Sequence, residues 1–481
     1  MDQSQPPGLL APLPRWQALL LAAAAVGAFQ LAFVPGFGGV ILLFLLAVWF
    51  LAVRCPFSGR VTFYGGIVFG FGLYAFPLGF FWAVFGAGAI VLWLVLAFWV
   101  SLFFSLVRQC RLRFGPMVAA MLVPFLWTGL EYFRGELYYL RFTWMAPGYA
   151  LADETLGGSL LHAGVYGVSF LFLALASGLV LCWQRPLGAI LVASVAVVLV
   201  WWLTTLGSKD SSVRSKNLRV AGVQMEFPGL AEVRVGLDHL TARYPDADVL
   251  VLSEYTFDGP VPDRIIKWCR DRRRYLVVGG KEPVPGGDFR NTAYVIGPDG
   301  KVVFQQTKAV PIQFFKDGRP AEQQRVWDSP WGKLGICICY DLSYTRVVDR
   351  LVRQGAQGLI VPTMDVESWG QRQHDLHARV APVRAAEYGL PIFRLASSGI
   401  SQVVGPDAKV LASAPFPGAE ALISGELELA GAGRLPLDRW VGPGCVVVTI
   451  LAAIAAALNG WDQRMQSQVL MKRQTYAQSL R

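Results

Sequence analysis

Long apolar runs separated by short polar segments fill the first 210 residues of the chain. A helix needs roughly 20 apolar residues to cross the hydrocarbon core of a membrane. The first run could be a signal peptide, but many similar runs follow it and no small-residue cleavage site is visible. The pattern therefore predicts a polytopic α-helical membrane domain. The expected spans lie near residues 16–34, 38–53, 62–82, 87–107, 115–131, 158–183, 187–206 and, after an interruption, 438–459.

Between residues 218 and 427 the pattern changes, because charged residues recur and short apolar runs alternate with amphipathic ones. We expect strands at 218–224, 248–253, 275–280, 291–297, 301–306, 333–339, 357–362, 391–396 and 400–405. Helices are expected at 229–244, 262–273, 344–354 and 370–388. This alternation is typical of an α/β sandwich whose sheets are covered by helices. The predicted division is a membrane domain (1–210), an α/β domain (217–430), a last span (436–460) and a tail (461–481).

The composition agrees with this division, since 54% of the residues are hydrophobic and only 16% are charged, with a mean hydropathy of +0.44. The net charge of +10 does not indicate a nucleic acid partner, because the basic residues flank the apolar spans and form no single basic face. Basic residues mark cytoplasmic segments, so we expect the N-terminus inside and the α/β domain outside. The predicted inner segments hold Arg15, Arg54, Arg60, Arg108, Arg111, Arg113, Arg185, Arg464, Lys472, Arg473 and Arg481, and the short outer loops hold Arg134 and Arg141.

Seven Cys occur without the paired spacing of a disulfide framework or a zinc site. His374 and His377 have a spacing that could suit a metal ion, but no Cys or acid cluster completes a ligand set. We therefore expect no metal and no cofactor.

The stretch from Lys333 to Tyr344 reads K-L-G-I-C-I-C-Y-D-L-S-Y. Its alternation predicts a buried strand that breaks at Tyr340-Asp341 before a helix. A Cys at such a break lies near backbone N–H groups, which favour a thiolate and can bind an oxyanion. Cys339 is therefore our candidate nucleophile, against the alternative of a buried, inert Cys. Tyr340 and Asp341 could shape the substrate pocket or could simply cap the helix.

Two further residues complete a candidate acyl-transfer site. Glu254 ends the apolar run V-L-V-L-S-E, and a carboxylate at the C-terminal end of a strand lies where α/β sheets place their chemistry. Lys308 follows a strand–turn–strand pattern whose turn is Pro298-Asp299-Gly300. A Glu could serve as base for the thiol, and a Lys could stabilise the charge on an attacked carbonyl oxygen.

Glu254, Lys308 and Cys339 resemble the Glu-Lys-Cys triad of the nitrilase (carbon–nitrogen hydrolase) superfamily. With the membrane spans, the chain is similar to the bacterial apolipoprotein N-acyltransferase family. The supporting motifs are N-T-A-Y-V-I-G-P-D-G-K-V-V, I-C-Y-D, R-A-A-E and R-L-A-S-S-G-I-S in the α/β part, and L-E-Y-F-R-G and G-V-Y-G-V-S-F in the membrane part.

The resemblance implies an αββα sandwich on the periplasmic side of the bacterial inner membrane. It also implies an acyltransferase that moves a fatty acyl group from a phospholipid, through a Cys thioester, to the N-terminal amine of a diacylated apolipoprotein. We expect a monomer whose partners are these two lipids and the bilayer. A membrane-anchored amidase or hydrolase stays open as an alternative, as does a non-catalytic binding module.

The chain departs from the family after Lys308, where A-V-P-I-Q-F-F replaces a longer segment that ends in V-P-F-G-E. Asp341 stands where Glu is usual, and Met364-Asp365 replaces N-D. Whether Asp317 takes the place of the missing acid stays open at this point. We expect Phe314 and Phe315 to contact acyl chains and Trp369 to belong to ordinary core packing.

Overall fold

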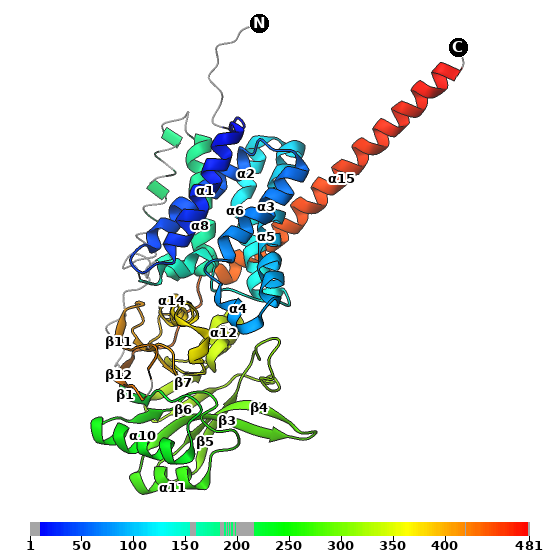
Figure 1. Ribbon diagram of the computed structural model, residues 1–481. Coiled ribbons are helices and arrows are strands. Elements are labelled where there is room, and N and C mark those ends of the chain that lie inside the picture. Colours follow the sequence, from blue (N-terminus) through cyan, green and yellow to red (C-terminus); the bar gives the residue numbers. More distant parts are fainter. Residues whose placement is uncertain are drawn as a thin grey trace.

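The computed structural model describes residues 10–153, 160–182 and 216–479 except 419, with scattered positions between 187 and 198, and side chains up to residue 458. Figure 1 shows two parts, a bundle of helices and an α/β sandwich stacked beneath it. The last helix, which follows the sandwich in sequence, returns to the bundle. The fold is therefore a polytopic helical part joined to a two-sheet α/β domain.

Long apolar helices make up the upper part. Five of the described helices are long and apolar enough to cross a membrane, namely Arg15–Ala32, Gly88–Phe114, Pro116–Leu137, Val165–Cys182 and Asp438–Leu458. The helices of this part are α1 (Arg15–Ala32), η1 (Gly38–Val40), α2 (Ile41–Val53), α3 (Gly59–Tyr74), α4 (Phe80–Phe85), α5 (Gly88–Phe114), α6 (Pro116–Tyr132), η2 (Phe133–Leu137), η3 (Pro147–Asp153), η4 (Leu161–Ala163), α8 (Val165–Cys182) and α15 (Asp438–Ser479).

Three predicted spans differ from the structure. One continuous helix over 62–82 is wrong, because α3 ends at Tyr74, just before Pro77, and a turn leads into the short helix α4. The span predicted at 158–183 begins as a helix only at Val165. The span predicted at 187–206 lies largely outside the described residues.

Small residues let α3 and α5 pack closely together. A Cβ at Gly70 would lie 2.7 Å from the Cα of Ala97, and one at Gly66 would lie 2.7 Å from the Cα of Ser101. Such a distance is impossible without moving a backbone, so this crossing requires glycine. Close approach through small residues is the usual way in which helices associate where lipid removes the hydrophobic drive between them.

The lower part contains two six-stranded sheets, ordered β12-β1-β2-β3-β4-β5 and β11-β10-β9-β8-β7-β6. In each sheet the central strands are parallel and the outer ones antiparallel, with Val220 opposite Val249 and Leu334 opposite Gly358. The strands are β1 (Lys216–Val223), β2 (Val249–Val251), β3 (Tyr275–Val284), β4 (Asp288–Ile296), β5 (Val302–Thr307), β6 (Val326–Ser329), β7 (Gly332–Ile336), β8 (Gly358–Thr363), β9 (Ile392–Ala396), β10 (Ser401–Val404), β11 (Val410–Ala414) and β12 (Leu422–Leu429).

Helices cover the outer faces of both sheets. The helices α10 (Leu230–Arg243) and α11 (Asp263–Arg272) pack on the first sheet through one apolar cluster. The helices α12 (Thr345–Arg353), α13 (Gln371–Ala378) and α14 (Val380–Tyr388) form the other outer layer, which faces the membrane helices (Figure 1). The single helix predicted at 370–388 is broken at Arg379, because Pro382 has no N–H to donate to the carbonyl of Ala378.

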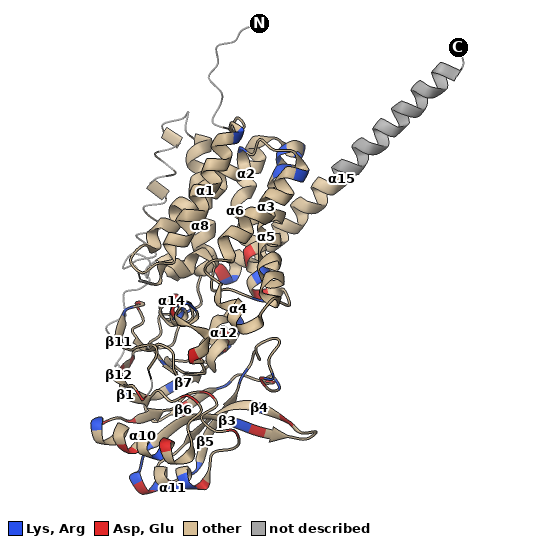
Figure 2. Cartoon of the chain, viewed as in Figure 1, with Lys and Arg blue, Asp and Glu red and all other residues tan. Residues whose placement is uncertain are grey.

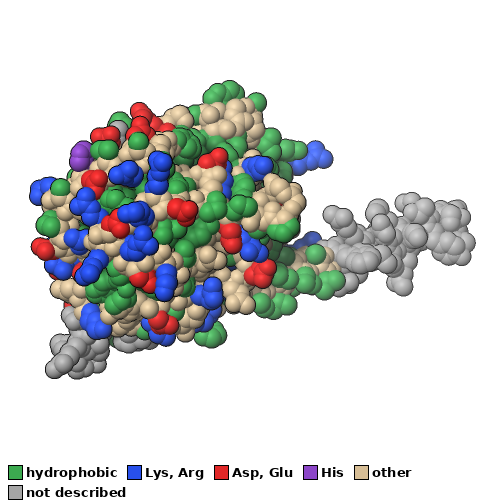
Figure 3. All heavy atoms as spheres, turned by 90° about the horizontal axis from the view of Figure 1, so that it is seen from below, with side chains coloured by type: hydrophobic (Ala, Val, Ile, Leu, Met, Phe, Trp, Pro, Cys, Tyr) green, Lys and Arg blue, Asp and Glu red, His purple; other side chains and the backbone are tan. Residues whose placement is uncertain are grey.

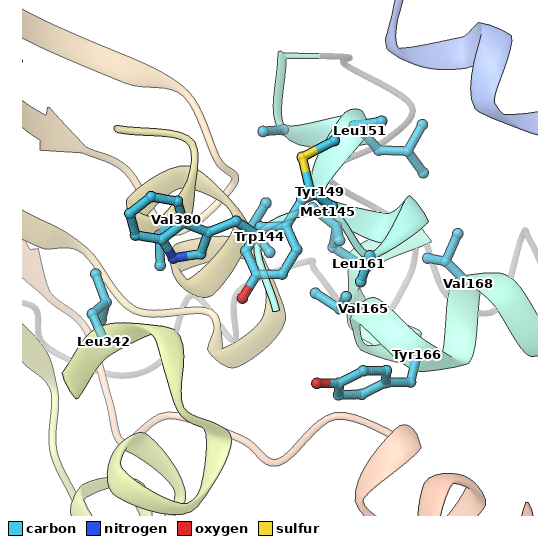
Figure 4. Close-up of a cluster of buried hydrophobic side chains, with 14 of the residues drawn as sticks. Trp144, Met145, Tyr149, Leu151, Leu161, Val165, Tyr166, Val168, Leu342 and Val380 are labelled. Carbon is cyan, nitrogen blue, oxygen red and sulfur yellow. The ribbon is translucent and has the colours of Figure 1, made fainter. Parts of the chain in front are cut away.

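The two parts share one packed junction. Figure 4 shows Trp144, Tyr149 and Tyr166 of the helical part gathered with Leu342 and Val380 of the sandwich. All five side chains are buried. The sandwich is therefore docked on the helices through a continuous apolar contact.

Charged residues are unevenly distributed. In Figure 2 the middle of the helical bundle is almost free of charge, basic residues gather at the end farthest from the sandwich, and residues of both signs lie at the end next to it. The basic residues at the far end include Arg54, Arg60, Arg108 and Arg111, of which Arg111 donates to the carbonyls of Val53 and Cys55. The face of the sandwich turned away from the bundle carries both signs of charge (Figure 3).

Candidate active site

Cys339 lies three residues beyond the end of β7, at the first position of the 3-10 helix η5 (Cys339–Ser343). The predicted strand therefore ends earlier, at Ile336. The φ angle of Cys339 is 53°, a conformation that costs energy for a residue with a side chain and that is typical of functional sites. Its sulfur is buried and lies 3.6 Å from the carbonyl oxygen of Met364. Burial, followed by the charge of Glu254, raises the pKa of the thiol well above its usual value.

Glu254 follows β2, at the carboxyl end of a parallel strand. Its Oε1 accepts hydrogen bonds from Nζ of Lys308 at 2.9 Å and from Nδ2 of Asn291 at 2.6 Å. Its Oε2 accepts the backbone N–H of Met364 at 2.8 Å. Burial raises the pKa of Glu254, and the Lys308 ammonium limits the rise. A carboxylate with a raised pKa is a better general base than a solvated one.

Lys308 comes directly after β5 and is buried. Its Nζ contacts two carboxylates, Glu254 at 2.9 Å and Asp317 at 2.8 Å. Burial opposes the charged form, but these two carboxylates hold the pKa of Lys308 well above its ordinary value. The Lys308 ammonium is therefore a fixed positive charge at the centre of the site.

Asp317, the acid that follows the shortened segment after Lys308, lies beside the Lys308 ammonium. Its Oδ1 accepts the hydroxyl of Tyr255 at 2.6 Å, and its Oδ2 accepts the backbone N–H of Ile312 at 2.8 Å. Although burial opposes ionisation, Lys308 and these hydrogen bonds hold the pKa of Asp317 below its usual value. The environments of the two carboxylates around Lys308 thus shift their pKa values in opposite directions.

The two residues after Cys339 have different surroundings. The carboxylate of Asp341 accepts the backbone N–H groups of Ala309 and Val310, at 2.9 and 2.8 Å, and burial raises its pKa to about 6. Asp341 therefore ties the loop after Lys308 to the nucleophile turn. The Tyr340 ring packs edge-on against Trp144 with centroids 5.7 Å apart.

A second buried network, which the sequence analysis missed, supports the Met364 backbone. Asp365 accepts from Nδ1 of His377 at 2.7 Å and pairs with the guanidinium of Arg394. The indole of Trp144 stacks on the His377 ring at 4.8 Å. Burial lowers the pKa of His377. Two features of the sequence point to this network: the departure from the family at Met364-Asp365, and the spacing of His374 and His377, which could also suit a metal ion.

An apolar cavity of about 130 Å³ lies between the two parts of the molecule. Tyr340 contributes to its wall, so the cavity reaches the residue that follows Cys339. Trp369 also lines it and is only partly buried, so the prediction that Trp369 belongs to ordinary core packing is wrong. The lining residues are Phe80, Phe81, Val84, Phe85, Leu92, Val95, Leu96, Leu140, Arg141, Phe142, Trp144, Ile312, Gln313, Phe314, Phe315, Tyr340, Trp369 and Gln373.

The arrangement provides a buried thiol, a carboxylate with a raised pKa, a buried cation and an adjoining apolar cavity. A thiol with a neighbouring base forms covalent acyl intermediates. A fixed cation stabilises an oxyanion at the attacked carbonyl. The apolar walls fit a hydrocarbon chain.

Comparison with known proteins matches both parts of the chain. Residues 25–178 match the family model of the apolipoprotein N-acyltransferase N-terminal domain, and residues 227–436 match that of carbon–nitrogen hydrolases. Relatives named apolipoprotein N-acyltransferase include one from Pseudomonas syringae pv. tomato, 26% identical over 84% of this chain and 89% of its own, and one from Azotobacter vinelandii, 26% identical over 93% and 95%. The nitrilase-superfamily protein Nit3 of Saccharomyces cerevisiae aligns in structure over 46% of this chain and 93% of its own, with 20% identity and a TM-score of 0.39.

Proposed function

Because the chain joins an apolipoprotein N-acyltransferase N-terminal domain to a carbon–nitrogen hydrolase domain, we propose that it is an N-acyltransferase of apolipoproteins. It takes a fatty acyl group from a membrane phospholipid and transfers it to the N-terminal amine of a diacylated apolipoprotein. One observation carries the proposal. A buried Cys beside a Glu and a Lys adjoins an apolar cavity whose walls come from both domains.

The first half-reaction begins with a proton transfer. Burial keeps the Cys339 thiol protonated, so a base is required, and the raised pKa of Glu254 suits it to this role. The resulting thiolate attacks the ester carbonyl of the phospholipid, and the C–O bond to the glycerol breaks. Glu254 returns the proton to the leaving alkoxide, so a lysophospholipid departs and an acyl thioester remains on Cys339.

Lys308 stabilises the tetrahedral oxyanion, together with the backbone N–H of Tyr340 at the start of η5. A well-placed oxyanion donor lowers the barrier by about 3 kcal/mol. Asp317 holds Lys308 from the other side, which leaves Glu254 available as the base.

In the second half-reaction the α-amine of the apolipoprotein attacks the thioester carbonyl. The C–S bond breaks, an amide forms, and the amine proton passes through Glu254 to the sulfur of Cys339. The enzyme returns to its starting state, so ping-pong kinetics are expected. Tyr340 supports both steps as a wall of the acyl cavity, and Asp341 fixes the loop that carries Lys308. No metal or cofactor is needed, and one chain supplies every group, so we expect a monomer.

The arrangement in the membrane supports this chemistry. Basic residues gather at the end of the bundle far from the sandwich (Figure 2), and such residues favour the cytoplasmic side. We propose the bacterial inner membrane as the location, with the catalytic domain on the periplasmic side. Both substrates are lipids, so a site at the membrane surface meets them by lateral diffusion.

The test is the intact mass of the purified protein after incubation with phospholipid, followed by addition of a diacylated Cys peptide. The expected result is an acyl adduct on Cys339 that is discharged onto the peptide amine. An adduct lost only to water would instead indicate a membrane-anchored amidase or hydrolase. No adduct with any phospholipid would refute the proposed donor.

A further inference from the structure

A second cavity, here called the junction cavity, opens where the membrane helices meet α12. Its volume is about 370 Å³. One wall comes from the end of the apolar helix Pro116–Leu137 and the other from α12. The lining residues are Tyr132, Glu136, Leu137, Arg141, Thr345, Arg346, Asp349, Arg350 and Arg353.

The acidic residues of the junction cavity already have partners. Asp349 pairs with Arg439 at 2.8 Å and accepts the Tyr388 hydroxyl at 2.6 Å. Glu136 accepts the Tyr166 hydroxyl at 3.0 Å. Arg353 approaches Asp349 at 3.9 Å. Asp349 is therefore compensated by Arg439, whereas Glu136 has a second carboxylate oxygen without a hydrogen-bond partner among the described residues and lies near Arg346. A single carboxylate still leaves the remaining arginines in excess.

Three arginines of the junction cavity form no ion pair among the described residues, namely Arg141, Arg346 and Arg350. Partial burial, followed by the charge of Arg141 and more weakly that of Arg350, lowers the pKa of the Arg346 guanidinium, while Tyr344 and Glu136 oppose this. Arg141 and Arg350 are therefore close enough to Arg346 for their charges to act on it. Arg346 and Arg350 are exposed to solvent. Guanidinium groups match phosphate in charge and in geometry.

The junction cavity adjoins the acyl cavity. Arg141 lines both, and its carbonyl oxygen accepts the hydroxyls of Tyr340 at 3.3 Å and Tyr344 at 3.5 Å. The ring of Tyr344 in turn lies 5.5 Å from the guanidinium of Arg346. Tyr340, Arg141 and Tyr344 thus connect the turn that carries Cys339 to Arg346. This connection lies beside the end of the apolar helix Pro116–Leu137.

We propose that the junction cavity binds the phosphodiester of the phospholipid acyl donor while an acyl chain enters the apolar cavity. This inference rests on the proposed function, and it assigns the cavity to the first half-reaction alone. The diacylated acceptor carries no phosphate, so the arginines recognise the donor alone. The lysophospholipid keeps the phosphodiester, so it leaves the junction cavity after the acyl group has been transferred to Cys339.

The test uses the full-length protein in a neutral detergent and the double variant Arg346→Gln/Arg350→Gln. Acyl-enzyme formation is followed by intact mass over a range of phospholipid concentrations. We expect the apparent KM for phospholipid to rise about tenfold or more, as for the loss of charge-assisted hydrogen bonds. Discharge of the preformed acyl-enzyme by the diacylated Cys peptide should keep its normal rate.

Three controls separate recognition of phosphate from damage to the site. A p-nitrophenyl fatty acid ester acylates Cys339 without a phosphate, so the double variant should react with it as the wild type does. Arg234→Gln removes an exposed arginine on α10, far from the membrane face, and should change nothing. Arg346→Lys/Arg350→Lys keeps the charge but not the guanidinium geometry, and should restore part of the lost affinity.

An unchanged KM for phospholipid in the double variant, beside a normal wild-type reaction, would overturn this site and leave the proposed function intact. An equal loss with phospholipid and with the p-nitrophenyl ester would also overturn it, because the arginines would then act on the chemistry and not on the donor. If the wild type itself forms an adduct only with the p-nitrophenyl ester, the phospholipid donor fails and this site fails with it.

Discussion

Two clusters of buried charge lie close together in this molecule, and they are built differently. At the junction between the domains, Arg384 pairs with Glu387 and donates to the carbonyls of Leu342 and Ser343 at 3.0 and 2.5 Å. Glu387 also accepts the backbone N–H of Val165, at the start of the membrane helix α8, at 2.7 Å. The active site instead combines Lys308 with two carboxylates and a thiol.

The two clusters differ in whether their side chains can gain and lose protons. An Arg stays charged at any physiological pH, so an Arg-based cluster holds one charge state and fixes one geometry. The junction accordingly joins a helix of the sandwich to the first turn of a membrane helix, where a carboxylate also meets a favourable helix dipole. The active site instead holds Glu254 and Asp317, whose pKa values are displaced in opposite directions, so the two carboxylates around Lys308 can differ in protonation.

The largest expected effect distinguishes the two cysteines of the nucleophile strand. Cys339→Ala should abolish the acyl adduct, because no other group of the site can form the thioester. Cys337→Ala should leave the adduct intact, since Cys337 is a buried core residue. The measurement is intact mass after incubation with phospholipid. Labelling that survives the loss of Cys339 would remove it from the role of nucleophile.

Glu387→Gln tests the junction. It leaves Arg384 buried beside a weaker partner, and breaking a buried ion pair typically costs about 3–5 kcal/mol of stability. We expect a clear fall in the unfolding temperature of the detergent-solubilised protein. Glu322→Gln, at a side chain that is 86% exposed and 3.6 Å from Arg290, is the matched control and should have almost no effect. A normal unfolding temperature together with lost activity would mean that Glu387 takes part in the reaction, which contradicts its assignment to the structural cluster at the junction.

Lys308→Ala tests the active site, where the expected loss is in the rate of acyl-enzyme formation. It removes one oxyanion donor, so acyl-enzyme formation should slow by about a hundredfold while binding of the phospholipid changes little. The rate of adduct formation at saturating phospholipid measures this. Because Glu254 and Asp317 then lack their shared cation, the unfolding temperature must be recorded beside the rate. Near-normal turnover in this variant would shift the proposed role to the exposed Lys316.

Much of the fold follows from the hydrophobic pattern, and the exceptions have physical reasons. The central strands are fully buried and mostly apolar, so β2, β8 and β9 were predicted within a few residues. The strands β6, β11 and β12 were missed, because edge strands mix polar and apolar residues and give a weak signal. The break between α13 and α14 depended on one proline within an otherwise helical pattern.

The candidate site was predictable where a residue follows a buried strand and unpredictable where it depends on contacts between distant parts of the chain. Glu254 and Cys339 follow buried strands, so local sequence indicates their position. Asn291 and Met364 contribute hydrogen bonds to Glu254 across 37 and 110 residues of chain, which no local pattern reports. The apolar cavity draws its walls from two domains, so neither sequence segment alone indicates it.

Asp317→Asn tests whether the two carboxylates beside Lys308, Asp317 and Glu254, have different roles. The negative charge of Asp317 helps to raise the pKa of Glu254, and Glu254 must be ionised to accept the proton of Cys339. The rate of acyl-enzyme formation should therefore fall as the pH drops through the pKa of Glu254. Without the Asp317 charge that pKa decreases, so the acidic limb of the pH–rate profile should move to lower pH. The plateau rate should also fall, by about tenfold, because a less basic carboxylate is a weaker general base.

Asp258→Asn, at an exposed carboxylate that pairs with Lys281, should leave the profile in place. A limb that stays fixed or moves to higher pH in Asp317→Asn would mean that Glu254 does not control the acidic limb, and the two carboxylates would then have to exchange their proposed roles.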